Sequence, residues 1–130
     1  MDPTLYRSLV GCLRYMTYTR PDILYAVRLV SRFMEEPKLM HWKVAKRILC
    51  YNRGTMTDGL FYSHHSNFEL VGYSDSDWTG DMDDRKSTSR FIFSMGDLVF
   101  SWMSKKQLIV IIFTCEAEYV AASTCVLDAI

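Results

Sequence analysis

The stretch that decides the fold is Phe68-Glu69-Leu70-Val71-Gly72-Tyr73-Ser74-Asp75-Ser76-Asp77. Its composition predicts a strand over residues 68–75, and the strand ends in acidic side chains. Because strand side chains alternate between the two faces of a sheet, Val71, Tyr73 and Asp75 share one face. A second acidic pair, Glu116 and Glu118, lies at the start of a helical pattern. We therefore expect a strand that presents Asp75 and a later helix that presents Glu118.

The chain changes its periodicity near the middle. Before that point, apolar residues at helical spacing predict helices over residues 6–16 and 39–52. Between them we expect a helix with Pro21 in its first turn and an apolar stripe over residues 23–34, which Pro37 ends. After the change of periodicity, short apolar runs predict strands at residues 59–62, 68–75, 91–93 and 98–102, with a hairpin turn at Met95-Gly96-Asp97. Residues 109–113 fit either a further strand or the approach to a helix.

The last predicted element is a helix over residues 116–130, with Thr114 as its cap. The apolar stripe expected on one side of it consists of Tyr119, Val120, Ser123, Val126 and Leu127. Together these patterns predict an α+β fold. Residues 1–56 form a helical segment, and residues 57–130 form a mixed sheet of three to four strands with one C-terminal helix.

Bulk composition indicates a folded chain with unevenly distributed charge. Hydrophobic residues make up 49% of the 130 residues and aromatic residues 14%, which excludes a disordered chain. The formal net charge is zero, yet residues 1–55 hold ten Lys/Arg against four Asp/Glu, and residues 56–130 hold five against eleven. Either the basic half meets phosphate and the acidic half holds metal, or the two halves attract each other.

The spacing of the cysteines and the length of the apolar runs indicate the cellular compartment of the protein. Cys12, Cys50, Cys115 and Cys125 include no Cys-x-x-Cys pair, so we interpret them as small buried hydrophobic residues of a reducing compartment. The N-terminus has neither the basic nor the apolar region of a signal peptide, and the run at residues 108–113 is too short to cross a bilayer. We therefore expect an intracellular protein without a membrane partner, with secretion left open.

Spacing disfavours three other kinds of site. A calcium loop starting at Asp75 would need a bidentate carboxylate at its twelfth position, where Lys86 stands. His64 and His65 are adjacent and have no cysteine pair with them, which does not suit zinc. A nucleophilic hydrolase would need a serine or cysteine placed beside a histidine, and no Gly-x-Ser-x-Gly motif is present.

A carboxylate metal site fits the acidic residues better. Phosphodiester hydrolysis with two metal ions roughly 4 Å apart needs carboxylates that converge from different elements. The ordinary alternative is that Asp75 caps a turn and that Glu118 complements the dipole of its helix. Spacing alone favours this ordinary alternative.

Four basic residues lie near one face of the third predicted helix, namely Lys43, Lys46, Arg47 and Arg53. Such a face can follow a nucleic-acid backbone. Taken by itself, the pattern is more typical of the solvated side of an amphipathic helix.

Eight motifs follow one another along almost the whole chain. They are Thr19-Arg20-Pro21-Asp22-Ile23, Gly72-Tyr73-Ser74-Asp75-Ser76-Asp77-Trp78, Ser101-Trp102-Met103-Ser104-Lys105-Lys106-Gln107, Glu116-Ala117-Glu118-Tyr119, and residues 6–11, 41–49, 59–62 and 84–89. Taken in chain order, they resemble the region that follows the reverse transcriptase in Pol polyproteins of copia-type retrotransposons. Two local departures are Arg90, where the family usually has glycine, and Phe113-Thr114-Cys115, which replaces a Ser-Ser-Thr-like sequence.

The resemblance implies that residues 1–56 are the connection behind the polymerase and that residues 57–130 begin a ribonuclease H-like domain. Asp75 and Glu118 would then match two catalytic carboxylates that ligate Mg²⁺ or Mn²⁺, and the partner would be an RNA–DNA hybrid. A further aspartate belongs to a strand beyond Ile130. The expected function is therefore that of a truncated fragment whose site is vestigial and whose metal binding is weak or absent.

The alternative function is that of a co-opted interaction protein, such as a secreted effector of the RxLR type. An exposed sheet edge would supply its contact with a protein partner. The stretch Gly11-Cys12-Leu13-Arg14 lacks the leading arginine of the RxLR motif.

Overall fold

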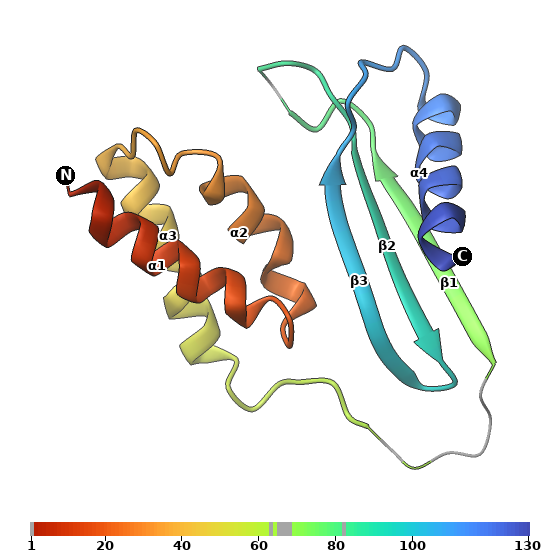
Figure 1. The fold of residues 1–130 in the computed structure, drawn as a ribbon, viewed down its shortest axis with the longest axis horizontal. Coiled ribbons are helices and arrows are strands. Elements are labelled where there is room, and N and C mark those ends of the chain that lie inside the picture. Colours follow the sequence, from red (N-terminus) through yellow and green to blue (C-terminus); the bar gives the residue numbers. More distant parts are fainter. Residues whose placement is uncertain (1, 63, 65–68, 82) are drawn as a thin grey trace. The chain divides into compact units, whose positions relative to one another are not determined.

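Helices and strands occupy different parts of the chain (Figure 1). The computed structural model describes residues 2–62, 64, 69–81 and 83–130. It divides into two compact units, Met1–Gly59 and Leu60–Ile130. The first unit contains helices α1, α2 and α3, and the second contains strands β1, β2 and β3 and helix α4. The predicted α+β fold class is confirmed.

Helix α1 (Pro3–Met16) starts at a well-formed N-cap. The Asp2 carboxylate accepts a hydrogen bond of 2.8 Å from the backbone N–H of Thr4, and proline follows the cap directly. This arrangement satisfies a backbone donor that the helix leaves unpaired, so the helix begins three residues earlier than the apolar pattern indicated. The inward side chains recur at helical spacing and are Tyr6, Val10 and Leu13.

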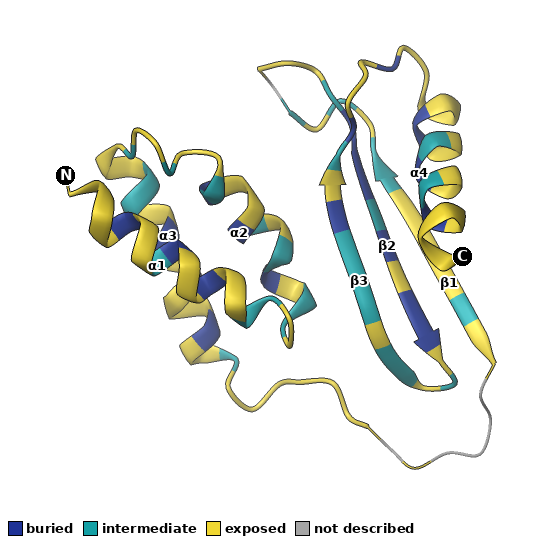
Figure 2. Ribbon diagram, viewed as in Figure 1, coloured by how far each residue is buried: buried dark blue, intermediate teal, exposed yellow. Residues whose placement is uncertain are grey.

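The other two helices complete the core of the helical unit. Pro21–Ile23 forms a short 3₁₀ turn that leads into α2 (Leu24–Ser31), and α3 spans Leu39–Gly54. Helix α2 ends at Ser31, before the predicted stop at Pro37. Figure 2 shows buried positions, in dark blue, on all three helices of this unit. The buried residues of its core are Tyr6, Val10, Leu13, Ile23, Val27, Val30, Ala45 and Ile48.

Arg20 joins the start of α2 to the end of α3. Its guanidinium donates to both carboxylate oxygens of Asp22, at 2.9 and 2.7 Å, and to the hydroxyl and carbonyl oxygens of Thr55, at 2.6 and 3.3 Å. The Arg20 side chain is only 17% exposed. Hydrogen bonds from Arg20 and Tyr51 hold the pKa of Asp22 below its ordinary value, with that from Arg20 the largest cause. A bidentate charged contact of this kind fixes geometry more firmly than a neutral hydrogen bond does.

The second unit contains a three-stranded antiparallel sheet in the order β1-β2-β3. The strands are β1 (Leu70–Asp77), β2 (Thr88–Met95) and β3 (Leu98–Lys106). The predicted hairpin is confirmed: Met95 pairs with Leu98, and Gly96 at the turn has a φ of 61° that favours glycine. The strand predicted at residues 59–62 is wrong, because these residues form no strand, and residues 109–113 lie in a loop before α4. The predicted start of the first strand, at residue 68, lies outside the described residues.

Helix α4 (Thr114–Ala129) packs against β1 and β2. The predicted apolar stripe of this helix is wrong in its main members. Ala117, Ala121 and Cys125 face the sheet, whereas Tyr119, Val126 and Leu127 are exposed. The predicted cap is also wrong, since Phe113 occupies the N-cap position and makes no side-chain cap.

The cysteines and the helix lengths give two further results. Of the four cysteines only Cys125 is buried, so the prediction of burial is wrong for Cys12, Cys50 and Cys115. Within the described part of the chain, every helix is too short or too polar to cross a membrane.

The contacts of Arg20 lead to a prediction about stability. Replacing Arg20 with alanine is expected to lower the free energy of unfolding of the helical unit by about 1–3 kcal/mol, because Asp22 and Thr55 lose charged hydrogen bonds. Chemical denaturation followed by circular dichroism measures this change. Arg53→Ala on the exposed side of α3 serves as the control and should change stability by less than about 0.5 kcal/mol. Equal losses in both variants would contradict the role of Arg20.

The same contacts predict a dependence on acid. The pKa of Asp22 is lowered by folding from its ordinary value of 3.8. A group of this kind contributes stability that is complete above its unfolded pKa and disappears as the pH falls through its folded pKa. The free energy of unfolding, measured from pH 6 down to about pH 2, should therefore fall once the pH drops below the ordinary pKa of Asp22. In Asp22→Asn the free energy of unfolding should fall less over this pH range than in the unaltered chain. The same pH dependence in both proteins would contradict the prediction.

Candidate metal centre and nucleic-acid interface

Strand β1 presents Asp75 and Asp77 on the sheet face that α4 does not cover. A side chain built at Gly72 would meet Phe93 and would lie 3.7 Å from the sulfur of Cys125, so the Gly72 position faces α4. The register of β1 with β2 is regular from residue 70 to residue 77. Positions an odd number of residues away therefore point to the other face. Ser76, between the two aspartates, turns toward the α4 side, and its hydroxyl oxygen is buried.

Arg90 of β2 lies between the two aspartates. It pairs directly with Asp75 across the strands and reaches Asp77 diagonally. One terminal nitrogen of its guanidinium is 3.6 Å from an Asp75 carboxylate oxygen, and the other is 3.6 Å from an Asp77 oxygen. The Asp75 side chain is 69% exposed and that of Asp77 42%, so dissolved ions can reach both carboxylates.

Glu118 lies in the second turn of α4 and is exposed. Its neighbour Ala117 is fully buried, and the Ala117 carbonyl accepts a hydrogen bond of 3.1 Å from the side-chain amide of Gln107. That amide also donates to the hydroxyl of Ser89 on β2, at 2.8 Å. Gln107 therefore links the first turn of α4 to the sheet and fixes the place of Glu118 along β1 and β2.

The structure brings the elements of Asp75 and Glu118 together, but strand alternation places Asp75 on the sheet face opposite the helix that carries Glu118. Helix α4 covers one face of the sheet, and Asp75 projects from the other. Residues 2–62, 64, 69–81 and 83–130 contain no group of three or more His, Cys, Asp or Glu side chains that could hold a metal ion. Mg²⁺ needs convergent oxygen ligands, so these residues as they lie do not fit a bound metal. The assignment of Asp75 and Glu118 as metal ligands stays a prediction.

The acidic loop after β1 is held by a lysine that the sequence patterns did not single out. The ammonium group of Lys106 forms ion pairs with the carboxylates of Asp81 and Asp84. Its hydrogen bond lowers the pKa of Asp84. The loop also contains Arg85 with a φ of 57°, a conformation that is uncommon for residues other than glycine. In the sequence, Lys106 is distinguished only by its place in the motif over residues 101–107, on which the family resemblance partly rests.

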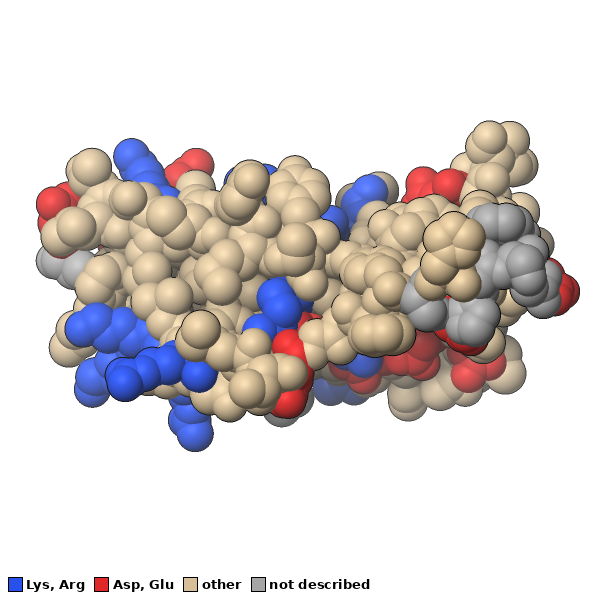
Figure 3. All heavy atoms as spheres, turned by 90° about the horizontal axis from the view of Figure 1, so that it is seen from below, with Lys and Arg blue, Asp and Glu red and all other residues tan. Residues whose placement is uncertain are grey.

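The basic face on α3 exists as predicted from helical spacing. Lys43, Lys46, Arg47 and Arg53 are all exposed, and the buried residues of α3 are Ala45, Ile48 and Asn52. At 100° per residue these two sets lie on opposite sides of the helix. Figure 3 shows Lys and Arg side chains gathered over the helical unit. Binding of nucleic acid by this face stays a prediction.

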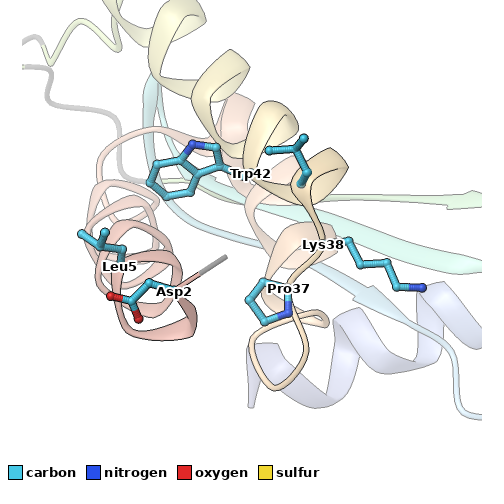
Figure 4. A pocket seen from close by; sticks show the side chains of 6 residues that line it. Asp2, Leu5, Pro37, Lys38 and Trp42 are labelled. Carbon is cyan, nitrogen blue, oxygen red and sulfur yellow. The ribbon is translucent and has the colours of Figure 1, made fainter.

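An open hollow lies beside the start of α3 (Figure 4). Asp2 and Leu5 line it from the N-terminal segment, and Pro37, Lys38, Leu39 and Trp42 line it from the other side. Its wall is mostly apolar. The Lys46 ammonium lies 5.2 Å from the centre of the Trp42 ring, so a residue of the basic face contacts a residue that lines the hollow. A cation above an indole ring is attracted to it electrostatically.

Comparison with known proteins identifies relatives of the chain. The chain is homologous to one short segment of retrovirus-related Pol polyproteins from copia-type transposons. No protein-family model matches it, and no solved structure matches it.

Three relatives show the extent of the similarity. The retrovirus-related Pol polyproteins from transposons RE2 and RE1 of Arabidopsis thaliana are 46% and 48% identical over 118 residues. These matches cover 91% of the chain but 8% of each polyprotein. The secreted RxLR effector protein 161 of Plasmopara viticola is 42% identical over 126 residues, which are 96% of the chain and 89% of that protein.

The approach of α4 to β1 yields a prediction about Gly72. A Cβ at this position would lie 2.8 Å from a Phe93 ring carbon, so valine must displace Phe93 or the helix. Gly72→Val is expected to lower the free energy of unfolding of the sheet unit by about 1–3 kcal/mol, the usual effect of overpacking. Thermal unfolding and near-ultraviolet circular dichroism test this. Gly59→Val is the matched control, because a Cβ at Gly59 meets nothing within 4 Å. Similar effects in the two variants would contradict the packing argument.

Proposed function

We propose that residues 57–130 are the first part of a ribonuclease H-like domain, and that residues 1–56 are the connection preceding it in the parent polyprotein. The observation that carries the proposal is the order of elements: three antiparallel strands followed by a helix, with Asp75 on the first strand and Glu118 on the helix. Similarity to retrotransposon Pol polyproteins over 91% of the chain supports it. The proposed parent activity is cleavage of the RNA strand in RNA–DNA hybrids, with Mg²⁺ or Mn²⁺ supplying activation of water and stabilisation of the leaving oxygen.

The 130 residues by themselves are proposed to be catalytically inactive. Two carboxylates carried by elements on different sides of a sheet compete poorly with water for Mg²⁺, because this ion gives up its hydration shell reluctantly. We therefore propose weak metal binding or none. The catalytic role of Asp75 and Glu118 would then be vestigial in this polypeptide.

A cleavage assay tests the absence of activity. The purified 130-residue polypeptide is incubated with a labelled RNA–DNA hybrid and either Mg²⁺ or Mn²⁺, alongside Asp75→Asn. We expect no difference between the two proteins, and no cleavage above a buffer control. Robust cleavage by the unaltered chain that Asp75→Asn abolishes would overturn the inactive assignment.

The basic face of α3 is proposed to bind the nucleic-acid backbone. Replacing both Lys43 and Arg47 with glutamine should weaken binding to an RNA–DNA hybrid at low salt, and should reduce the dependence of log Kd on log salt by about 1–2 units. Fluorescence anisotropy over a salt series measures both quantities. Lys86→Gln with Lys105→Gln removes the same charge from the sheet unit and serves as the control. Equal effects of the two double variants would show that only net charge matters.

A second candidate function is that of a secreted interaction protein. The similarity to secreted RxLR effector protein 161 over 89% of that protein favours it. In the described sheet, β1 and β3 are the outer strands, and an outer strand offers backbone groups to a partner. Detection of the chain in secretions or inside host cells would support this candidate. Confinement to the cells that produce it would count against it.

A further inference from the structure

Arg90 is placed as a permanent cation for the acidic end of β1. Its guanidinium nitrogens lie 3.6 Å from Asp75 and 3.6 Å from Asp77, which are next-but-one neighbours on the same sheet face. A long side chain on the neighbouring strand reaches both the directly opposite residue and the diagonal one. The strand register therefore fixes one positive charge beside two negative ones.

Stability does not explain this arrangement well. The three side chains are 41% to 69% exposed, and half-exposed ion pairs contribute little to the free energy of folding. The guanidinium has a larger effect on the binding of a dissolved cation, which it repels. A divalent ion at the two carboxylates would lie within roughly 5 Å of the guanidinium, inside the screening distance of about 8 Å at physiological salt. Metal binding would have to overcome repulsion by Arg90 or displace its side chain.

We propose that Arg90 is the built-in counter-cation of this strand end and keeps divalent metal ions away from Asp75 and Asp77. The inference builds on the proposed role of Asp75 as a metal ligand in the parent domain. It identifies a residue of this chain that sets metal affinity without being a ligand itself. Arginine suits the role because it remains charged at every physiological pH.

Terbium(III) binding tests the proposal without relying on catalysis. Terbium is a hard cation with oxygen ligands, and Trp78 next to Asp77 can sensitise its luminescence. The expected result is that Arg90→Gln binds terbium about tenfold more tightly than the unaltered chain, whereas Arg90→Lys, which keeps the charge, does not. Arg90→Thr is made in parallel, because a β-branched residue suits the middle strand if glutamine impairs folding.

Two controls separate this effect from simpler ones. Adding Asp75→Asn to Arg90→Gln should remove the gain, which excludes binding at the neighbouring acidic loop. Lys105→Gln removes one positive charge from β3 and should leave terbium affinity unchanged. Equal affinity of Arg90→Gln, Arg90→Thr and the unaltered chain would overturn the proposal, and so would a gain that survives loss of Asp75 or that Lys105→Gln reproduces.

The outcome is separable from that of the proposed function. Hybrid cleavage by the unaltered chain would overturn its proposed inactivity and leave the terbium comparison intact. Unchanged terbium affinity on neutralising Arg90 would overturn the counter-cation role, whatever the cleavage assay gives.

Discussion

The close approach of α4 to β1 at Gly72 determines the arrangement of the sheet unit. Gly72 leaves room for the Phe93 ring and the Cys125 sulfur, which lie over the strand where a side chain would otherwise stand. This contact fixes which face of β1 is covered, and strand alternation then determines the direction of every other side chain on it. Asp75 and Asp77 face Arg90, away from the helix, because Gly72 faces the helix.

Close packing also explains why the inward side of α4 was predicted wrongly. The apolar pattern selected Tyr119, Val126 and Leu127 because they are large and hydrophobic. A helix that lies against a glycine and a phenylalanine ring instead presents small residues, and Ala117, Ala121 and Cys125 supply them. Hydrophobicity indicates that a helix has a buried face, but the space available on the partner element decides which face it is.

Local signals predicted what depends on local geometry. The turn at Gly96 specified the pairing of β2 with β3, and proline at position 21 marked a helix start. The pairing of β1 with β2 spans the acidic loop, whose length specifies no register. The contacts of Arg90 with Asp75 and Asp77 therefore could not be predicted from the sequence. The resemblance showed only that Arg90 stands where the family usually has glycine. The contact of Arg20 with Thr55 could not be predicted either, because the two residues are distant in sequence.

A fixed guanidinium and a divalent metal ion can each neutralise the negative charge of Asp75 and Asp77. Adjacent carboxylates on one sheet face repel each other, and a cation between them reduces that repulsion. A metal ion does so only when further ligands offset the loss of its hydration shell. Arg90 needs no such help, because the strand register holds it in place and solvent still covers part of its surface. This face carries only two carboxylates of the described strand, and Glu118 is carried by the helix on the other face. We therefore expect the Arg90 guanidinium, rather than a dissolved metal ion, to neutralise Asp75 and Asp77.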